Sequence, residues 1–182
     1  MGPLAALRRD HRLLISVLDT LEQWIPRLAQ GANPAHLARF ARFLRAFLEN
    51  WHQPKEEQVL IATLEREGRY DTELSDLVTK DHEELRALLR EATLLSDDIV
   101  AANDARIERA AAVLLQVASL LRHHIEFEET VVFPIAEGEL PAGVMPQLER
   151  SLRAMELDPR RSFLAAPLKQ VASALLQLQA CA

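Results

Sequence analysis

Polar residues interrupt an apolar stripe in "WHQPKEEQVLIATLE", residues 51–65 of the chain. The apolar positions around this stretch recur three and four residues apart, which predicts one face of a helix, and His52 and Glu56 lie on that face. The stretch "HHIEFEETVVF" places His124 and Glu128 in the same relation. Residues four apart in a helix lie one above the other. Burying an imidazole and a carboxylate together costs several kcal/mol unless both have partners, so the fold has to supply those partners.

Helix-forming residues dominate the chain, because Leu, Ala, Arg and Glu are abundant and only 5 Gly occur. Gly31, Gly68 and the stretch "EGELPAG" separate the periodic segments. In "NPAH", Asn33 is predicted to be an N-cap, with Pro34 at the first helical position. The predicted helices run over residues 4–30, 34–67, 71 or 72 to 101, and 106–136, and Pro26 and Pro54 are expected to disturb the first and the second. Long helices joined by short links predict an all-α, up-down-up-down four-helix bundle.

The C-terminal part of the chain is predicted to form a separate extension. We place the bundle domain at residues 1–140 and the extension at residues 141–182. The extension contains "MPQLERSLRAMEL" and "LAAPLKQVASALLQLQA", which predict one or two further helices. It carries no motif for chemistry, so we expect it either to pack on the bundle or to mediate self-association as a homodimer.

The polar motifs belong to an internal repeat. "DHRLLISVL" contains His11 and precedes the first motif, and "DHEELRALL" contains His82 and precedes the second. His11 and His52 lie 41 residues apart, while His82 and His124 lie 42 apart. The two helix pairs are therefore interpreted as copies of one helical hairpin related by a pseudo-twofold axis. Six polar residues are predicted to converge inside the bundle: His11, His52, Glu56, His82, His124 and Glu128.

A lone histidine on an apolar face is usually an ordinary core residue with one hydrogen bond. Six polar residues placed symmetrically on four core stripes are hard to explain in that way. No buried Lys or Arg is evident on these stripes, so the carboxylates need another source of positive charge. Divalent metal ions supply that charge and accept imidazole and carboxylate ligands. The pattern predicts a binuclear centre with two histidines for each metal and two bridging carboxylates.

These residues resemble the hemerythrin-like, or HHE cation-binding, family. Its pattern of H…HxxxE…H…HxxxE is similar to the order found over residues 4–140, and "HQPKEEQVLI" and "HHIEFEETVVFP" are similar to its flanking segments. The resemblance implies a di-iron site with a bridging water, hydroxide or oxo group. By this resemblance His11 and His52 would ligate one iron, His82 and His124 the other, and Glu56 and Glu128 would bridge them. The residues alone do not separate iron from manganese or zinc.

Two departures from the oxygen-carrying members bear on function. Those proteins have a second histidine four residues after the first one on the third helix, where this chain has Arg86. Their last carboxylate is an Asp five residues after a histidine, whereas Glu128 follows His124 by four. One iron would then lack a ligand and have a more open position, or recruit another residue. This favours reaction with oxygen, peroxide or nitric oxide over reversible oxygen carriage.

The expected function is binding or sensing of a small ligand such as oxygen, nitric oxide or peroxide, or handling of iron under oxidative or nitrosative stress. A first alternative is a di-iron enzyme that consumes peroxide or oxygen. A second is a helical interaction module in which the C-terminal helices bind a partner and the metal only supports the fold.

Charge and composition exclude several other classes. The net charge of -6 argues against nucleic acid or an anionic membrane as the main partner. The sequence has no apolar run long enough to span a bilayer and no signal-peptide pattern at its start. Its single cysteine, Cys181, can form neither a disulfide framework nor a thiolate metal site. These features predict a cytoplasmic protein.

The remaining polar residues near the motifs are assigned to the surface. Glu57 and Glu129 are interpreted as parts of a solvated face, with hydrogen bonding to the ligands or a role as spare metal ligands as the alternatives. Asp10 and Asp81, which precede the first histidine of each half, are interpreted as helix-surface acids, with orientation of neighbouring groups as the alternative. His123 lies about 100° round the helix from His124 and is interpreted as a boundary residue.

Overall fold

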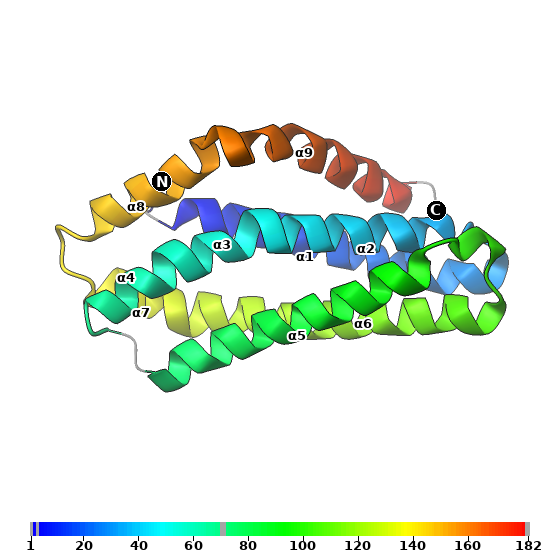
Figure 1. Cartoon of the computed structure of the whole chain (residues 1–182), viewed down its shortest axis with the longest axis horizontal. Coiled ribbons are helices and arrows are strands. Elements are labelled where there is room, and N and C mark those ends of the chain that lie inside the picture. The colour runs from blue at the N-terminus through cyan, green and yellow to red at the C-terminus, as the bar shows by residue number, and fades with distance from the viewer. Residues whose placement is uncertain (1, 3, 70–71, 181–182) are drawn as a thin grey trace.

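Four helical rods run alternately up and down around a shared apolar core (Figure 1). The computed structural model describes residue 2, residues 4–69 and residues 72–180, and these contain no β-strand. The first rod is α1 (Ala5–Trp24) with the 3₁₀ segment η1 (Ile25–Gln30); the second is α2 (Ala35–Phe47), η2 (Leu48–His52), α3 (Gln53–Lys55), η3 (Glu56–Ile61) and α4 (Ala62–Arg66). The third is α5 (Thr72–Ser96) with η4 (Ile99–Ala101), and the fourth is α6 (Asp104–Phe127), η5 (Glu128–Val132) and α7 (Phe133–Glu139). The predicted all-α four-helix bundle is confirmed.

Backbone conformation ends the rods close to the predicted places. Gly31 and Gly68 have φ values of +84° and +64°, a left-handed conformation that glycine adopts without strain. The prediction of Asn33 as the N-cap was wrong by one residue, because the regular helix begins at Ala35 and Pro34 occupies the N-cap position. Asn33 still accepts a hydrogen bond from the backbone N–H of Ala35 at 3.0 Å. The third helix is shorter than predicted. It ends at Ser96 because Asp98 adopts a left-handed conformation with φ +53°. Asp71, the alternative start of that helix, and Cys181 lie outside the described residues.

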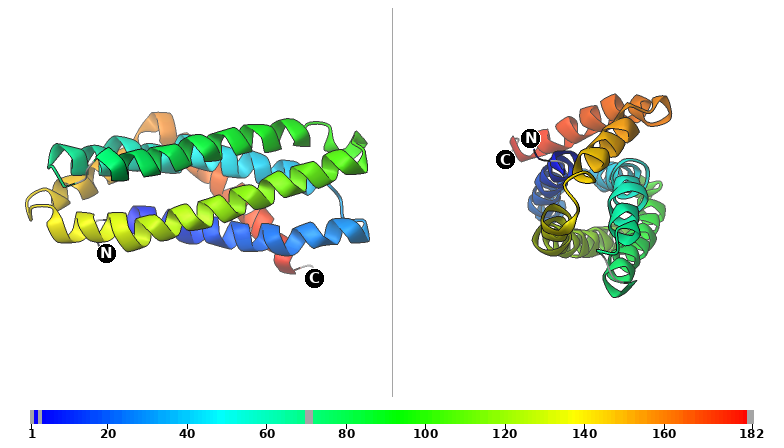
Figure 2. Two further views of the ribbon diagram at one scale, coloured as in Figure 1. Left: turned by 90° about the horizontal axis from the view of Figure 1, so that it is seen from below. Right: turned by 90° about the vertical axis from the view of Figure 1, so that its left-hand side faces the viewer.

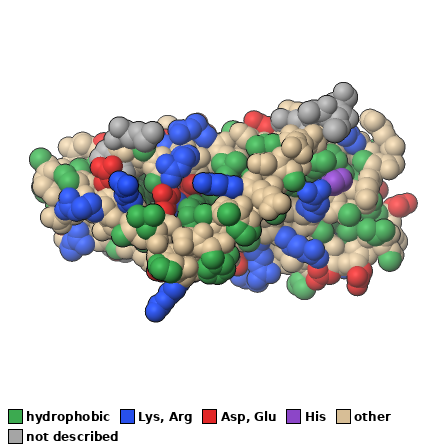
Figure 3. Space-filling model, turned by 90° about the horizontal axis from the view of Figure 1, so that it is seen from above, with side chains coloured by type: hydrophobic (Ala, Val, Ile, Leu, Met, Phe, Trp, Pro, Cys, Tyr) green, Lys and Arg blue, Asp and Glu red, His purple; other side chains and the backbone are tan. Residues whose placement is uncertain are grey.

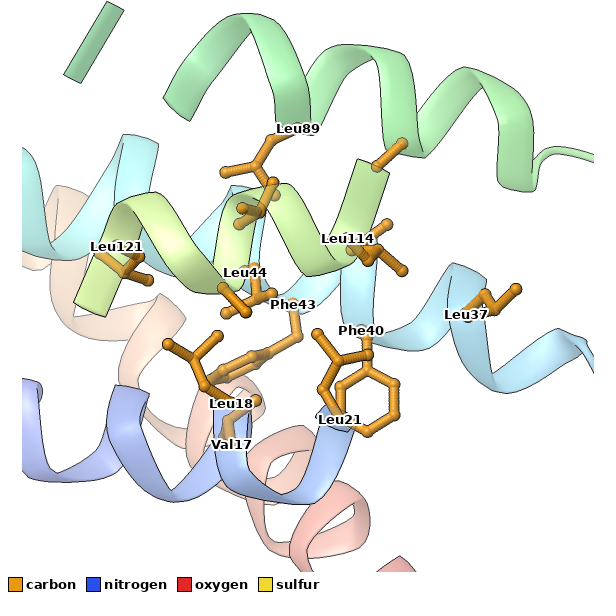
Figure 4. Close-up of a cluster of buried hydrophobic side chains, with 14 of the residues drawn as sticks. Val17, Leu18, Leu21, Leu37, Phe40, Phe43, Leu44, Leu89, Leu114 and Leu121 are labelled. Carbon is orange, nitrogen blue, oxygen red and sulfur yellow. The ribbon is translucent and has the colours of Figure 1, made fainter. Parts of the chain in front are cut away.

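Two apolar clusters fill the interior of the bundle. The larger one joins all four rods, and Leu18, Phe40, Leu89 and Leu114 are among its fully buried members (Figure 4). The second cluster contains Leu7, Leu60, Val78 and Phe133. On every rod the histidine of the polar motif falls between residues of one cluster and residues of the other. The polar residues therefore form a layer that is closed off from water on both sides.

Three segments of π-helix carry part of this polar layer. His52 lies in η2, Glu56 in η3 and Glu128 in η5. The N–H of Gln53 donates to the carbonyl of Leu48, five residues earlier. The N–H of Phe133 donates to the carbonyl of Glu128 in the same way. Regular helices were predicted here, with a kink at Pro54; the structure instead has π-helix on both sides of Pro54. Such segments are rare and occur frequently at functional sites.

The C-terminal residues form two more helices, α8 (Met145–Leu157) and α9 (Pro159–Ala180), outside the ring of four rods (Figure 2). α9 packs along α1 and α2, and α8 packs against the π-helical segment η3. Their buried contacts come from Leu148, Leu152, Leu168, Ala172 and Leu175. No helix in the described part of the chain is long and apolar enough to cross a bilayer.

Candidate metal centre

The six polar residues singled out by the repeat meet in one buried layer. Each of them is at most 2% exposed to solvent. His11, His52, Glu56 and Glu128 offer ligand atoms that all lie within 4.8 Å of one another. A second group with the same property consists of Glu56, His82, His124 and Glu128. The two groups share both carboxylates and differ in their histidines.

The distances across the layer show how the carboxylates are shared. Glu56 Oε1 lies 2.8 Å from His52 Nε2 and 3.5 Å from His11 Nε2, while its Oε2 lies 3.3 Å from His82 Nε2. Glu128 Oε2 lies 3.2 Å from His11 Nε2 and 3.6 Å from His124 Nε2. Glu56 thus contacts both histidines of the first helix pair and one of the second, and Glu128 contacts one histidine of each pair. The imidazoles all face the carboxylates through Nε2.

The other ring nitrogen of each of three histidines is hydrogen-bonded to an acid. Nδ1 of His11 lies 2.8 Å from Glu129, and Nδ1 of His82 lies 2.7 Å from Glu57. Nδ1 of His124 lies 3.3 Å from Asp81. A carboxylate only accepts, so these rings donate their Nδ1–H groups to it and turn Nε2 toward the centre of the layer. There Nε2 of His82 and Nε2 of His124 also lie 3.2 Å apart.

The fourth histidine repeats this arrangement more loosely. His52 Nδ1 lies 3.4 Å from Asp10, and Asp10 is only 5% exposed. In each half the Asp before the first histidine faces the second one, and the Glu after the motif carboxylate faces the first histidine of the other half. The interpretation of Asp10, Asp81, Glu57 and Glu129 as surface acids was therefore wrong. Their contacts agree with the alternatives, in which the aspartates orient neighbouring groups and the glutamates hydrogen-bond to the histidines.

Three of these four acids form an ion pair with a basic side chain. Arg8 Nε lies 3.2 Å from Glu129, Arg86 forms an ion pair with Glu57, and Lys55 forms one with Asp10. Lys55 is only 2% exposed, so the expectation of no buried Lys or Arg was wrong, although its charge pairs with Asp10 and not with the central glutamates. Arg86 stands where oxygen-carrying hemerythrins have a histidine, and its guanidinium is paired with Glu57.

In the metal-free protein, the neighbouring charges shift the pKa values of His11, His82 and Glu56. Burial would lower the pKa of His11, but the carboxylates of Glu128, Glu129 and Glu56 outweigh burial and raise it to about 11. Burial likewise opposes the rise in the pKa of His82, which Glu56 and Glu57 bring to about 9. Burial would raise the pKa of Glu56, but the imidazoles around it, His52 first, hold it well below its usual range.

We expect the metal-free protein to lose stability as the pH rises from 7 to 10. The imidazoles of His11 and His82 have pKa values above the unfolded value of about 6.5, so folding favours their protonated forms. That contribution is complete below pH 6.5 and is lost as the pH rises through about 9 for His82 and about 11 for His11. The slope is at most about 1.4 kcal/mol per pH unit for each group.

Urea unfolding of the metal-free protein at pH 7 and pH 9 measures this effect. Protein supplied with metal is the control, because imidazoles that bind a metal stay deprotonated throughout, and its stability should change less over the same range. A metal-free protein that is more stable at pH 9 than at pH 7 would contradict the charge assignment.

The donor set fits a metal ion. Several buried atoms have no hydrogen-bond partner, namely Nε2 of His11 and His52 and both oxygens of Glu56 and of Glu128. Buried polar atoms are nearly always hydrogen-bonded or bound to a metal. Imidazole nitrogen with carboxylate oxygen suits iron, manganese and zinc, and the described groups contain no thiolate that would favour softer ions.

Comparison with known proteins agrees with this geometry. The family model of the hemerythrin HHE cation binding domain matches residues 2–136. Uncharacterized proteins of Mycobacterium tuberculosis and Mycobacterium bovis are 28% identical to the chain over 138 residues, which is 75% of this chain and 54% of each relative. The chain thus spans about half the length of the curated relatives it matches. No solved structure matches the chain significantly.

Proposed function

Because the chain belongs to the hemerythrin HHE cation-binding domain family, we propose that it holds two iron ions and uses them to bind or sense oxygen, nitric oxide or peroxide. The observation that carries this proposal is the sharing of Glu56 and Glu128 between two groups of ligand atoms. A carboxylate that faces a different histidine with each oxygen, as Glu56 does, is placed to bridge two cations.

The proposed ligands follow the two groups. His11 and His52 would hold one metal, His82 and His124 the other, and Glu56 and Glu128 would join them. The pair of carboxylates would neutralise part of the metal charge inside an apolar interior, where unpaired charge is costly. Manganese and zinc have the same ligand preferences, so the iron assignment rests on the family.

The surrounding residues would prepare the histidines for this task. Glu129 and Glu57 accept hydrogen bonds from the Nδ1–H groups of His11 and His82, which fixes both rings with Nε2 toward the centre. Arg8 and Arg86 hold these two acids in turn. Phe133 stacks on His11 with a ring-centroid distance of 5.3 Å and helps to keep water from this side.

An open coordination position would allow reaction with a small ligand. Iron supplies reversible electron transfer and a place for oxygen, nitric oxide or peroxide to bind. Arg86 replaces a histidine ligand of the oxygen carriers and is paired with Glu57, so the centre has one imidazole fewer than theirs. The ligand atoms are enclosed between two apolar clusters. That enclosure favours diatomic ligands and peroxide.

Spectroscopy of ferrous protein tests the proposal. Anaerobic protein loaded with Fe(II) should develop a near-ultraviolet charge-transfer band when one equivalent of oxygen or peroxide is added. Zinc-loaded protein is the matched control and should not change. Unchanged spectra in the iron protein would contradict a reactive centre and favour a structural metal. Continued consumption of excess peroxide would favour the di-iron enzyme over a binding protein or sensor.

A further inference from the structure

A series of charged and polar side chains connects the C-terminal helix α8 with the proposed metal centre. Glu156 of α8 lies 3.2 Å from the ammonium group of Lys55. Lys55 pairs with Asp10, and Asp10 lies 3.4 Å from Nδ1 of His52. Each group contacts the next, and the whole series crosses from the extension to one of the proposed ligands.

The two central groups of this series, Lys55 and Asp10, are buried. Lys55 and Asp10 are 2% and 5% exposed. Removing a charged pair from water costs several kcal/mol per ion unless the groups satisfy each other. The ammonium group of Lys55 also lies 4.8 Å from the ring centre of Trp51, a favourable cation–π contact. Lys55 is therefore held by three different partners.

The feature exists in one half of the pseudo-twofold repeat only. Lys55 follows His52 by three residues, and Phe127 occupies the equivalent place after His124. The acid that faces His124, Asp81, has a side chain 26% exposed, compared with 7% for Asp10. The extension covers the His52 side of the centre, so the two halves of the site differ in their surroundings.

We propose that the C-terminal extension is coupled to the metal centre through Lys55, which acts as a positioning residue for Asp10 and His52. This inference rests on the proposed function, since it requires a metal at His11 and His52. Metal binding would fix His52 and thereby Asp10, Lys55 and Glu156. Because coupling between two sites is reciprocal, ordering of α8 would in turn strengthen metal binding. Metal occupancy of the centre would thus change the order of α8 and, with it, the outer face formed by α8 and α9.

The packing near Glu156 allows such a response. A cavity of about 400 Å³ lies between the extension and the bundle, with Asp10, Trp51, Glu156, Leu157 and Leu168 among its lining residues. At this point Glu156 forms ion pairs with Lys55 and, at 2.9 Å, with Arg9. The outer face itself carries Arg and Lys side chains between hydrophobic ones (Figure 3), so a change in α8 would be presented to solvent.

Hydrogen exchange of the full chain, with and without Fe(II) under anaerobic conditions, tests the coupling. In the wild-type protein, Fe(II) should slow exchange in residues 145–157 about fivefold or more. In Glu156→Gln the metal-dependent change in these residues should fall below about twofold. The matched control is Arg9→Gln, which removes the other ion pair of Glu156 but leaves Lys55 in place, and should keep the wild-type response.

Metal titration provides the second readout. Lys55→Met should weaken one of two Fe(II) binding steps about tenfold or more and leave the other unchanged. Iron that binds and slows exchange in the rods, with no change in α8 or with the same change in Glu156→Gln, would overturn the coupling while leaving the proposed function intact. Failure of the wild-type protein to bind iron would overturn both.

Discussion

Replacing Glu128 by alanine is expected to reduce the metal content from two ions per chain to one at most. Glu128 contributes to both groups of ligand atoms, so its loss removes an oxygen from each proposed metal position. Glu56→Ala should have the same effect for the same reason. Both side chains are fully buried, and the remaining imidazoles would face each other without a carboxylate to balance a second divalent charge. Elemental analysis of the purified variants measures the result.

His123→Ala is the matched control for these variants. It removes an imidazole next to His124 in sequence, but His123 lies on the exposed side of α6. We expect the control to keep the wild-type metal content. Two metals retained in Glu128→Ala, or a loss in His123→Ala as large as that in Glu128→Ala, would show that the bridging assignment is wrong.

Metal loading should raise the thermal unfolding midpoint by an amount on the order of 10 °C. A ligand at a thousandfold excess over its dissociation constant stabilises the folded state by about 4 kcal/mol per site. For a chain of this size each kcal/mol corresponds to about 2–4 °C. The metal would also bind the buried oxygens of Glu56 and Glu128, which have no hydrogen-bond partner.

Differential scanning calorimetry before and after chelation measures this difference. The Glu56→Ala variant separates specific loading from general ion effects, because its midpoint should respond far less to added metal. Equal midpoints for metal-free and metal-loaded wild-type protein would mean that the centre contributes little to folding stability.

The fold and the six central residues could be predicted because they follow from periodicity along the chain. The apolar stripes define each rod, and Gly31 and Gly68 end two of them with left-handed conformations. The repeat of His and Glu at equal spacing indicates convergence without any three-dimensional information. The end of the third helix was missed because Asp98, which is not a glycine, adopts positive φ.

The acids around the histidines were harder to predict. Asp10 and Asp81 neighbour their histidines in sequence and therefore point about 100° away on the helix, toward what looks like a surface. Whether a second helix lies there depends on how the rods pack. The one available signal was their recurrence, together with that of Glu57 and Glu129, at equivalent places in both halves. Surface acids have no reason to recur in this way.

Two further features lie beyond pattern analysis. The π-helical segments that begin at Leu48 and end at Val132 are short and of a rare type, and the apolar spacing in these stretches predicted regular helix. Burial of Lys55 depends on the extension, whose Glu156 reaches it from far along the chain. Nothing in the local sequence of Lys55 distinguishes it from an exposed lysine.

The most direct test of the binuclear iron proposal is the metal content of wild-type protein, purified anaerobically after expression with sufficient iron. The proposed ligand set requires two irons per chain, shared by Glu56 and Glu128. A content of two irons per chain is the predicted result. A chain that carries no metal, or only zinc, under these conditions would contradict the proposed function and leave the helical bundle without its redox centre.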